Sequence, residues 1–141
     1  MNENIKKHWG SLIALAIFAL LAAGSLETDT DTAQVQSQAA SYTLSANQLY
    51  SEYDANEVAA DAKYKDRVVV VSGYIQDIGK ELAGRAYVVI GGQGFLDGVQ
   101  CVFTEGEDST VARLYKGQYI SIKGEVSGKG GNVILYKCRL Q

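Results

Sequence analysis

The chain has 141 residues, of which 13 are basic and 16 are acidic, so its net charge is −3. This length allows one domain with a substantial core, and 47% apolar residues exclude disorder over most of the chain. One histidine and two cysteines are too few for a zinc site, which needs three or four nitrogen or sulfur ligands. We therefore expect neither a metal nor another cofactor.

The first 26 residues have the pattern of a targeting segment. Lys6 and Lys7 precede an uncharged stretch of 18 residues from Trp9 to Leu26, as in a secretory signal peptide. The same stretch is long enough to cross a membrane as an uncleaved anchor, so residues 9–26 have two interpretations. Both place the rest of the chain outside the cytoplasm, because the lysines stay inside. The protein would be periplasmic or anchored in the inner membrane.

Residues 27–43 are expected to form a polar, acidic linker, because they show no regular spacing of apolar side chains. The charge is uneven along the chain. Residues 26–66 carry eight acidic and two basic side chains, whereas residues 67–141 carry nine basic and seven acidic ones. This small excess gives little support to nucleic-acid binding, which usually needs a strongly basic surface.

Residues 44–66 are expected to be helical. Two short helices or one helix broken near Asp54 both fit, because Ser45 with Gln48 and Asp54 with Glu57 match the capping-box spacing. An apolar stripe recurs at helical spacing. Its members are Leu49, Tyr53, Ala60 and Tyr64.

From Arg67 onward the apolar period changes to two, which predicts strands. The expected strands are 67–78, 85–90, 98–103, 118–127 and 132–140, with a short helix between the third and the fourth. Three strands, one helix and two strands is the order of the OB-fold, a five-stranded, partly open barrel. We therefore predict a mainly β protein, with an OB-fold over residues 67–141 and residues 44–66 packed on it as a helical extension.

Alternation along each strand predicts which side chains face the barrel interior. The inward rows are Val69, Val71, Gly73 and Ile75; Val99, Cys101 and Phe103; Ile120, Ile122, Gly124 and Val126; and Ile134, Tyr136, Cys138 and Leu140. Val68 and Val70 would then face outward, and the helical stripe is expected to cover them. Tyr74 and Tyr119 are expected to stack outside as a cross-strand pair.

Cys101 and Cys138 fall on the third and fifth strands, which are neighbours in an OB barrel. A disulfide between them would stabilise the fold by about 3–4 kcal/mol in the chain-entropy model, and an oxidising compartment would permit it. The alternative is a pair of buried thiols that pack as small apolar groups. A catalytic thiol is not expected, because the one histidine, His8, lies in the targeting segment. We do not expect an enzyme.

OB-folds bind ligands across the second and third strands and the adjoining loops. Tyr87 offers a stacking ring on the second strand, and Gln100 lies on the outer face of the third. Basic side chains around this rim complete a weak candidate site. They are Lys80, Arg85, Lys129 and Lys137. Solvated or structural roles are the alternative for all six.

Four stretches resemble a known family, the tRNA_anti-like proteins. They are "YDANEVAADAKYKDRVVVVSGYI", "VQCVF", "ARLYKGQYISIKGEV" and "ILYKCRL", and the similarity as a whole covers about residues 44–140. The resemblance implies an OB-fold in an exported or membrane-anchored bacterial protein, fits cysteines on the third and fifth strands, and attaches no catalytic residues. Many relatives look like lipoproteins, whereas this chain lacks the lipid-accepting cysteine.

Three functions remain open at this stage. The first is a non-enzymatic binding module of the cell envelope, whose ligand is an oligosaccharide, a peptide or a protein surface. The second is binding of single-stranded nucleic acid, which the family name implies by fold analogy. The third is a purely structural envelope or stress protein.

Overall fold

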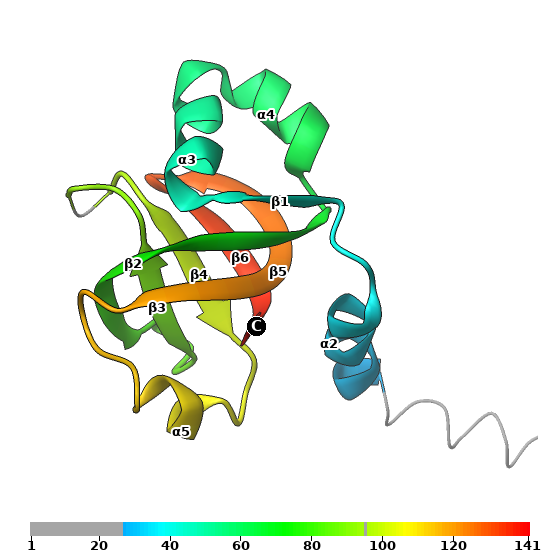
Figure 1. Ribbon diagram of the computed structural model, residues 1–141. Helices are drawn as coiled ribbons and strands as arrows, with labels where there is room; N and C mark the ends of the chain where they lie inside the picture. Colours follow the sequence, from blue (N-terminus) through cyan, green and yellow to red (C-terminus); the bar gives the residue numbers. More distant parts are fainter. Residues whose placement is uncertain (1–26, 95) are drawn as a thin grey trace, which may run out of the picture. The chain divides into compact units, whose positions relative to one another are not determined.

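Five strands close into a barrel in the computed structural model (Figure 1). They are β2 (Val68–Lys80), β3 (Ala86–Ile90), β4 (Val99–Phe103), β5 (Tyr119–Gly130) and β6 (Asn132–Leu140). Neighbours follow the order β2-β3-β4-β6-β5, and pairing of β2 with β5 closes the barrel. The predicted OB-fold is confirmed, and the short helix expected between the third and fourth strands is α5 (Asp108–Val111).

The structure describes residues 27–94 and 96–141. The predicted targeting segment, residues 1–26, lies outside the described residues. Within them, no helix combines the length and the apolar character that a membrane span needs.

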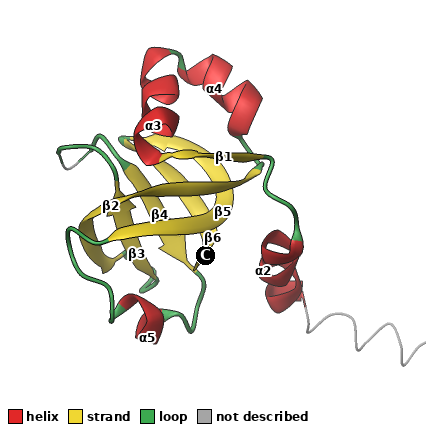
Figure 2. Ribbon diagram, in the orientation of Figure 1, coloured by secondary structure: helices red, strands yellow, loops and turns green. Residues whose placement is uncertain are grey.

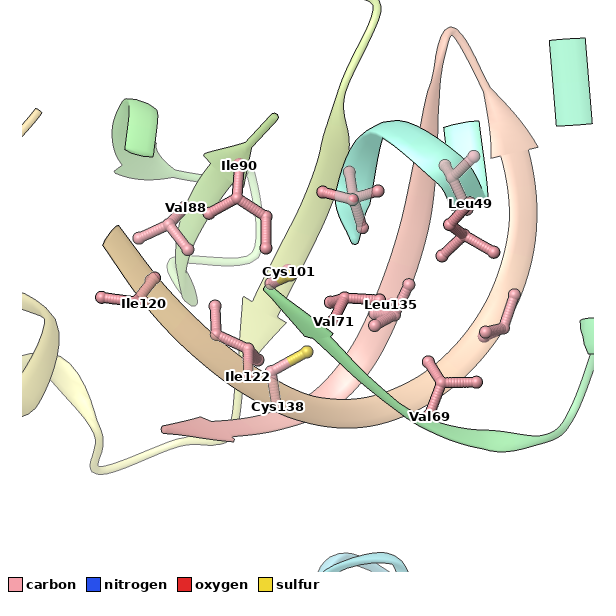
Figure 3. Close-up of a cluster of buried hydrophobic side chains, with 14 of the residues drawn as sticks. Leu49, Val69, Val71, Val88, Ile90, Cys101, Ile120, Ile122, Leu135 and Cys138 are labelled. Carbon is pink, nitrogen blue, oxygen red and sulfur yellow. The ribbon is translucent and has the colours of Figure 1, made fainter. Parts of the chain in front are cut away.

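The barrel core is built from the inward rows that alternation predicts (Figure 3). Val69 and Val71 of β2, Cys101 of β4 and Ile122 of β5 are fully buried in one apolar cluster. Outside the barrel, the rings of Tyr74 and Tyr119 meet edge to face with centroids 5.0 Å apart, as expected of a cross-strand pair. The period of two therefore predicts most of the barrel interior correctly.

The last strand departs from its predicted row. The inward residues of β6 are Val133, Leu135 and Cys138, because a register shift between β4 and β6 inserts one residue. The extra residue is Lys137, whose φ is +55°, as in a β-bulge. Val133 and Leu135 fix the inward parity before the bulge, so the prediction that Ile134 and Tyr136 face inward is wrong.

Two helices lie at one end of the barrel and α5 lies at the other (Figure 2). They are α3 (Ala46–Ala55) and α4 (Glu57–Tyr64). Ser45 caps α3 as predicted, since its side chain accepts a hydrogen bond from the Gln48 N–H. The second cap is not Asp54: the Asn56 side chain accepts from the Ala59 N–H instead.

The helical stripe has a different partner from the one predicted. Leu49 and Tyr53 are fully buried in the same cluster as Val69 and Val71, whereas Val68 and Val70 are not part of it. The stripe therefore closes the barrel end and does not cover the outer valines. The reason is that α3 follows an additional strand beside β2, which directs the helix over the barrel opening.

The expected linker, residues 27–43, contains regular structure that the sequence did not predict. Helix α2 spans Glu27–Ser37, and strand β1 spans Tyr42–Ser45. Strand β1 pairs in parallel with β2, where Leu44 lies opposite Val71 and joins the core. At the end of α2, the Gln36 side chain donates a hydrogen bond to the Lys137 carbonyl at 2.7 Å.

Candidate ligand-binding face

The outward side chains of β3, β4 and β6 lie on one side of the sheet, which we call the β3–β4–β6 face; Val89 and Val102 are buried there, and the other members are half-buried. Its members are Tyr87, Val89, Gln100, Val102, Ile134 and Tyr136. Strand pairing places Tyr87 opposite Val102 and Val89 opposite Gln100, and it places Ile134 beside Gln100. The OB-fold binds ligands on the corresponding strands.

Tyr136 and Arg85 are in contact on this face. The Arg85 guanidinium carbon lies 5.2 Å from the centroid of the Tyr136 ring, within the range of a cation–π contact. The Arg85 Nε also donates a hydrogen bond to Glu81. Stacking on one side and a carboxylate on the other hold the guanidinium in place over the ring.

Tyr87 lies at the other side of the face, where β2 and β3 pair. Its hydroxyl donates a hydrogen bond of 3.4 Å to Asp77, and the Lys116 ammonium lies 3.1 Å from the same carboxylate. Burial and the nearby Asp77 charge raise the pKa of Tyr87 above its ordinary value, so the phenol stays neutral. Gly79 leaves the space for this ring, because a Cβ there would lie 2.7 Å from the Tyr87 hydroxyl.

The structure brings four of the six predicted site residues to this surface and leaves two elsewhere. Arg85, Tyr87 and Gln100 lie on or over it, and Lys137 follows Tyr136 directly on β6. Lys80 pairs with Asp108 of α5 at one barrel end. Lys129 lies at the α3 end, 3.3 Å from Asp54 and 5.4 Å from the centroid of the Tyr50 ring.

Sequence reasoning missed Tyr136, because alternation assigned it to the interior. The one available signal was its place next to a lysine inside an otherwise apolar strand, which is compatible with a bulge but does not identify one. The correction matters because Tyr136 gives the face its second aromatic ring.

The positive charges on the face have acidic partners. Arg85 pairs with Glu81, and the Lys137 ammonium lies 3.5 Å from Glu125. The surface therefore offers stacking and hydrogen bonds more readily than a track of free cations. Among the described residues, no group of three or more His, Cys, Asp or Glu side chains could hold a metal ion.

Cys101 and Cys138 are both buried and free in the structure. The register shift places Cys138 opposite Phe103, whereas Cys101 lies opposite Leu135. Burial, and then the neighbouring Cys101, raise the pKa of the Cys138 thiol. The disulfide is not formed in this structure and stays a prediction.

Comparison with known proteins adds a family and a fold. The family model described as tRNA_anti-like matches residues 1–140. Among solved structures, the chain resembles a lipoprotein from Klebsiella pneumoniae subsp. pneumoniae that is proposed to bind nucleic acid, with 23% identity, a TM-score of 0.59, and coverage of 70% of this chain and 90% of that chain. A chain from the structure of OBody NL8 bound to hen egg-white lysozyme matches with 19% identity and a TM-score of 0.39, over 52% of this chain and 91% of that one. None of the curated proteins matches.

Proposed function

Because the chain belongs to the tRNA_anti-like family, we propose that it is a non-enzymatic OB-fold binding module of the bacterial cell envelope. The proposed ligand lies across the β3–β4–β6 face. The observation that carries this proposal is the Arg85 guanidinium held over the Tyr136 ring, on the surface that also presents Tyr87. Aromatic and arginine side chains of this kind supply much of the affinity at binding surfaces.

The envelope location rests on two supports. The sequence of residues 1–26 has the pattern of an export signal or anchor. The similar Klebsiella protein is a lipoprotein, a class of protein held at a membrane from outside the cytoplasm. We propose that the OB domain of this chain likewise works outside the cytoplasm, either free in the periplasm or held by residues 9–26.

The charge of the face favours a ligand without phosphates. Arg85 and Lys137 are each paired with a carboxylate, and Lys116 is likewise paired with Asp77. Phosphate contacts need unpaired side-chain cations, which displace the counterions condensed on the nucleic acid. An oligosaccharide, a peptide or a protein surface is therefore the first candidate for the ligand.

Single-stranded nucleic acid is the second candidate. The family name and the description of the Klebsiella protein favour it, and two tyrosine rings on one face are suited to base stacking. Against it stand the paired cations of the face. A protein that bound by phosphate neutralisation would lose affinity steeply with salt.

The experiment is a titration of the full-length, isotope-labelled protein, followed by NMR, with three probes: a neutral tetrasaccharide, an uncharged decapeptide and a dT12 oligonucleotide. Saturable shifts confined to Tyr87, Gln100 and Tyr136 would support the proposed face. Arg85→Gln should weaken such binding about tenfold, the scale of one desolvated cation–π contact, and Arg113→Gln, at an exposed position just after α5, is the matched control.

Each outcome separates the candidates. Binding of dT12 that falls steeply between about 50 and 200 mM salt would favour nucleic acid over the first candidate. No saturable shift on this face with any probe would overturn the binding proposal and favour the structural role. An equal effect of Arg85→Gln and Arg113→Gln would show that the ligand lies elsewhere.

A further inference from the structure

A hollow of about 320 Å³ lies between α3 and the loop that joins β3 to β4. Its walls are Asn47, Tyr50, Ser51, Gly92, Gln93 and Asp97. None of these residues belongs to the β3–β4–β6 face. The volume is at the lower end of the range of small-molecule pockets, about 300–1,000 Å³, so a ligand here would be small.

Hydrogen bonds between the loop and its surroundings shape this hollow. The Gly92 N–H donates to the Asn47 side-chain oxygen at 2.7 Å. The Asp97 carboxylate accepts from the N–H groups of Gln93 and Gly94, at 3.0 and 2.8 Å. Gly92 has a φ of +74°, and a Cβ on it would lie 2.4 Å from the Asp97 carboxylate, so only glycine fits this wall. The pocket is thus formed before any ligand arrives.

Several polar groups of the walls remain available. The single hydrogen bond to Asn47 uses its carbonyl oxygen, which leaves the amide NH₂ with two donors. The Ser51 hydroxyl and the Gln93 side-chain amide lie at the exposed rim, and neither has a hydrogen-bonding partner among the described residues. The walls therefore offer both donors and acceptors, beside the ring of Tyr50.

The charge of the hollow selects against anions. Asp97 supplies a negative charge, because its backbone hydrogen bonds hold the pKa of this carboxyl below the ordinary 3.8. Lys129 lies over the Tyr50 ring and pairs with Asp54. The wall residues themselves include no cation. A phosphate or carboxylate entering the site would meet a like charge without a compensating partner.

We propose that this hollow binds an uncharged polyol about the size of one sugar ring. Such a ligand carries adjacent hydroxyl groups, each able to donate and to accept, which match the amides of Asn47 and Gln93, the Ser51 hydroxyl and the Asp97 carboxylate. Its C–H surface can pack against Tyr50, as aromatic rings pack against apolar surface. This inference does not depend on the function proposed for the β3–β4–β6 face, because the two surfaces share no residue.

The test uses the full-length, isotope-labelled protein and two probes, N-acetylglucosamine and N-acetylglucosamine 6-phosphate, followed by NMR. We expect the neutral sugar to shift the side-chain amides of Asn47 and Gln93 and the Gly92 backbone amide saturably, with a millimolar dissociation constant. The phosphorylated sugar should bind at least about tenfold more weakly, because a tenfold loss is about 1.4 kcal/mol, which is within the range of one close like-charge contact near a protein surface.

Substitutions at the rim test the chemistry without threatening the fold. Ser51→Ala and Gln93→Ala should each weaken the neutral sugar about threefold to tenfold, the scale of one hydrogen bond. Ser109→Ala, an equally exposed serine on α5, is the matched control and should leave binding unchanged. Asn47→Asp keeps the oxygen that accepts from Gly92 and removes the donors, so it should also weaken binding.

Three results would overturn the proposal. One is the absence of saturable shifts with the neutral sugar; another is equal or tighter binding of the phosphorylated sugar. The last is an affinity that Ser51→Ala and Gln93→Ala leave unchanged. Sugar binding that shifts only Tyr87 and Tyr136 is a case of the first result, since the hollow then shows no shifts, and it would support the β3–β4–β6 face.

Discussion

Gly124 and Cys138 occupy adjoining space in the barrel core, and this makes the effect of one methyl group predictable. A Cβ on Gly124 would lie 2.6 Å from the Cys138 sulfur and 3.0 Å from the Tyr136 carbonyl oxygen. Cys138 is fully buried, so its side chain cannot turn toward solvent. Gly124→Ala should therefore lower the free energy of unfolding by about 1–3 kcal/mol, the usual cost of overpacking.

The sulfur contributes the closer of the two clashes, so removing it should recover part of this loss. In a Cys138→Ala background, Gly124→Ala should cost at least about 0.5–1 kcal/mol less than in the original chain, because contacting residues couple by such amounts. The Tyr136 carbonyl remains, so the cost should not vanish. Urea unfolding followed by circular dichroism measures the free energy of unfolding of the original chain, the two single variants and the double variant, all in reduced form.

Gly130→Ala on the same strand is the matched control, since a Cβ there makes only an ordinary contact of 3.5 Å with Ile134. It should change the stability by less than about 0.5 kcal/mol. The reasoning fails if Gly124→Ala is equally mild, or if its cost is the same with and without the Cys138 sulfur. Either result would mean that β5 and β6 are not packed as described.

Three further predictions concern a cap, a carboxylate and the thiols. Asn56→Ala should lower the free energy of unfolding by about 0.5–2 kcal/mol in urea, whereas Asp54→Ala should lower it much less, because only Asn56 caps α4. The reverse order would support Asp54 as the cap. Asp97→Asn should destabilise the protein at neutral pH, and the difference in stability should shrink as the pH falls below about 4. The folded state lowers the pKa of the Asp97 carboxyl, so this group stabilises the fold at a pH above its unfolded-state pKa and loses the effect when it is protonated. A difference in stability that is constant with pH would contradict the backbone hydrogen bonds to Asp97. Protein isolated from the periplasm and unfolded without reductant should take up no thiol reagent once the predicted disulfide has formed, and two labelled cysteines, Cys101 and Cys138, would refute it.

The barrel was predictable because each strand and each turn is marked by residues that are close together in the sequence. The alternation of Val69 and Val71 along β2 fixes which side chains face inward, and each glycine-rich turn marks the end of a strand. The order of strands and helix then selects the OB-fold. Even the outer pair of Tyr74 and Tyr119 follows from alternation combined with the pairing of two strands.

The features that escaped prediction depend on contacts distant in the sequence. The bulge at Lys137 reverses which side chains of β6 face inward. The residue type does not predict this bulge, since a positive φ at lysine is uncommon. Strand β1 exists because the edge of β2 is available to it, and four residues have no intrinsic strand period to detect. The hollow beside Asn47 requires the loop after β3 to approach α3, so the sequence alone could not reveal it.

Strand β1 also affects how the molecule can open. It has only four residues at the edge of the sheet, and α3 and α4 follow it in the sequence before the chain reaches its parallel partner β2. Such a short edge is the kind of element that unfolds locally before the rest of a domain. Its departure would free the β2 backbone opposite Tyr42–Ser45, and an unpaired edge of this kind readily accepts a strand from another molecule. By pairing with β2, β1 covers an edge of the sheet, and its loss would allow edge-to-edge association with another molecule.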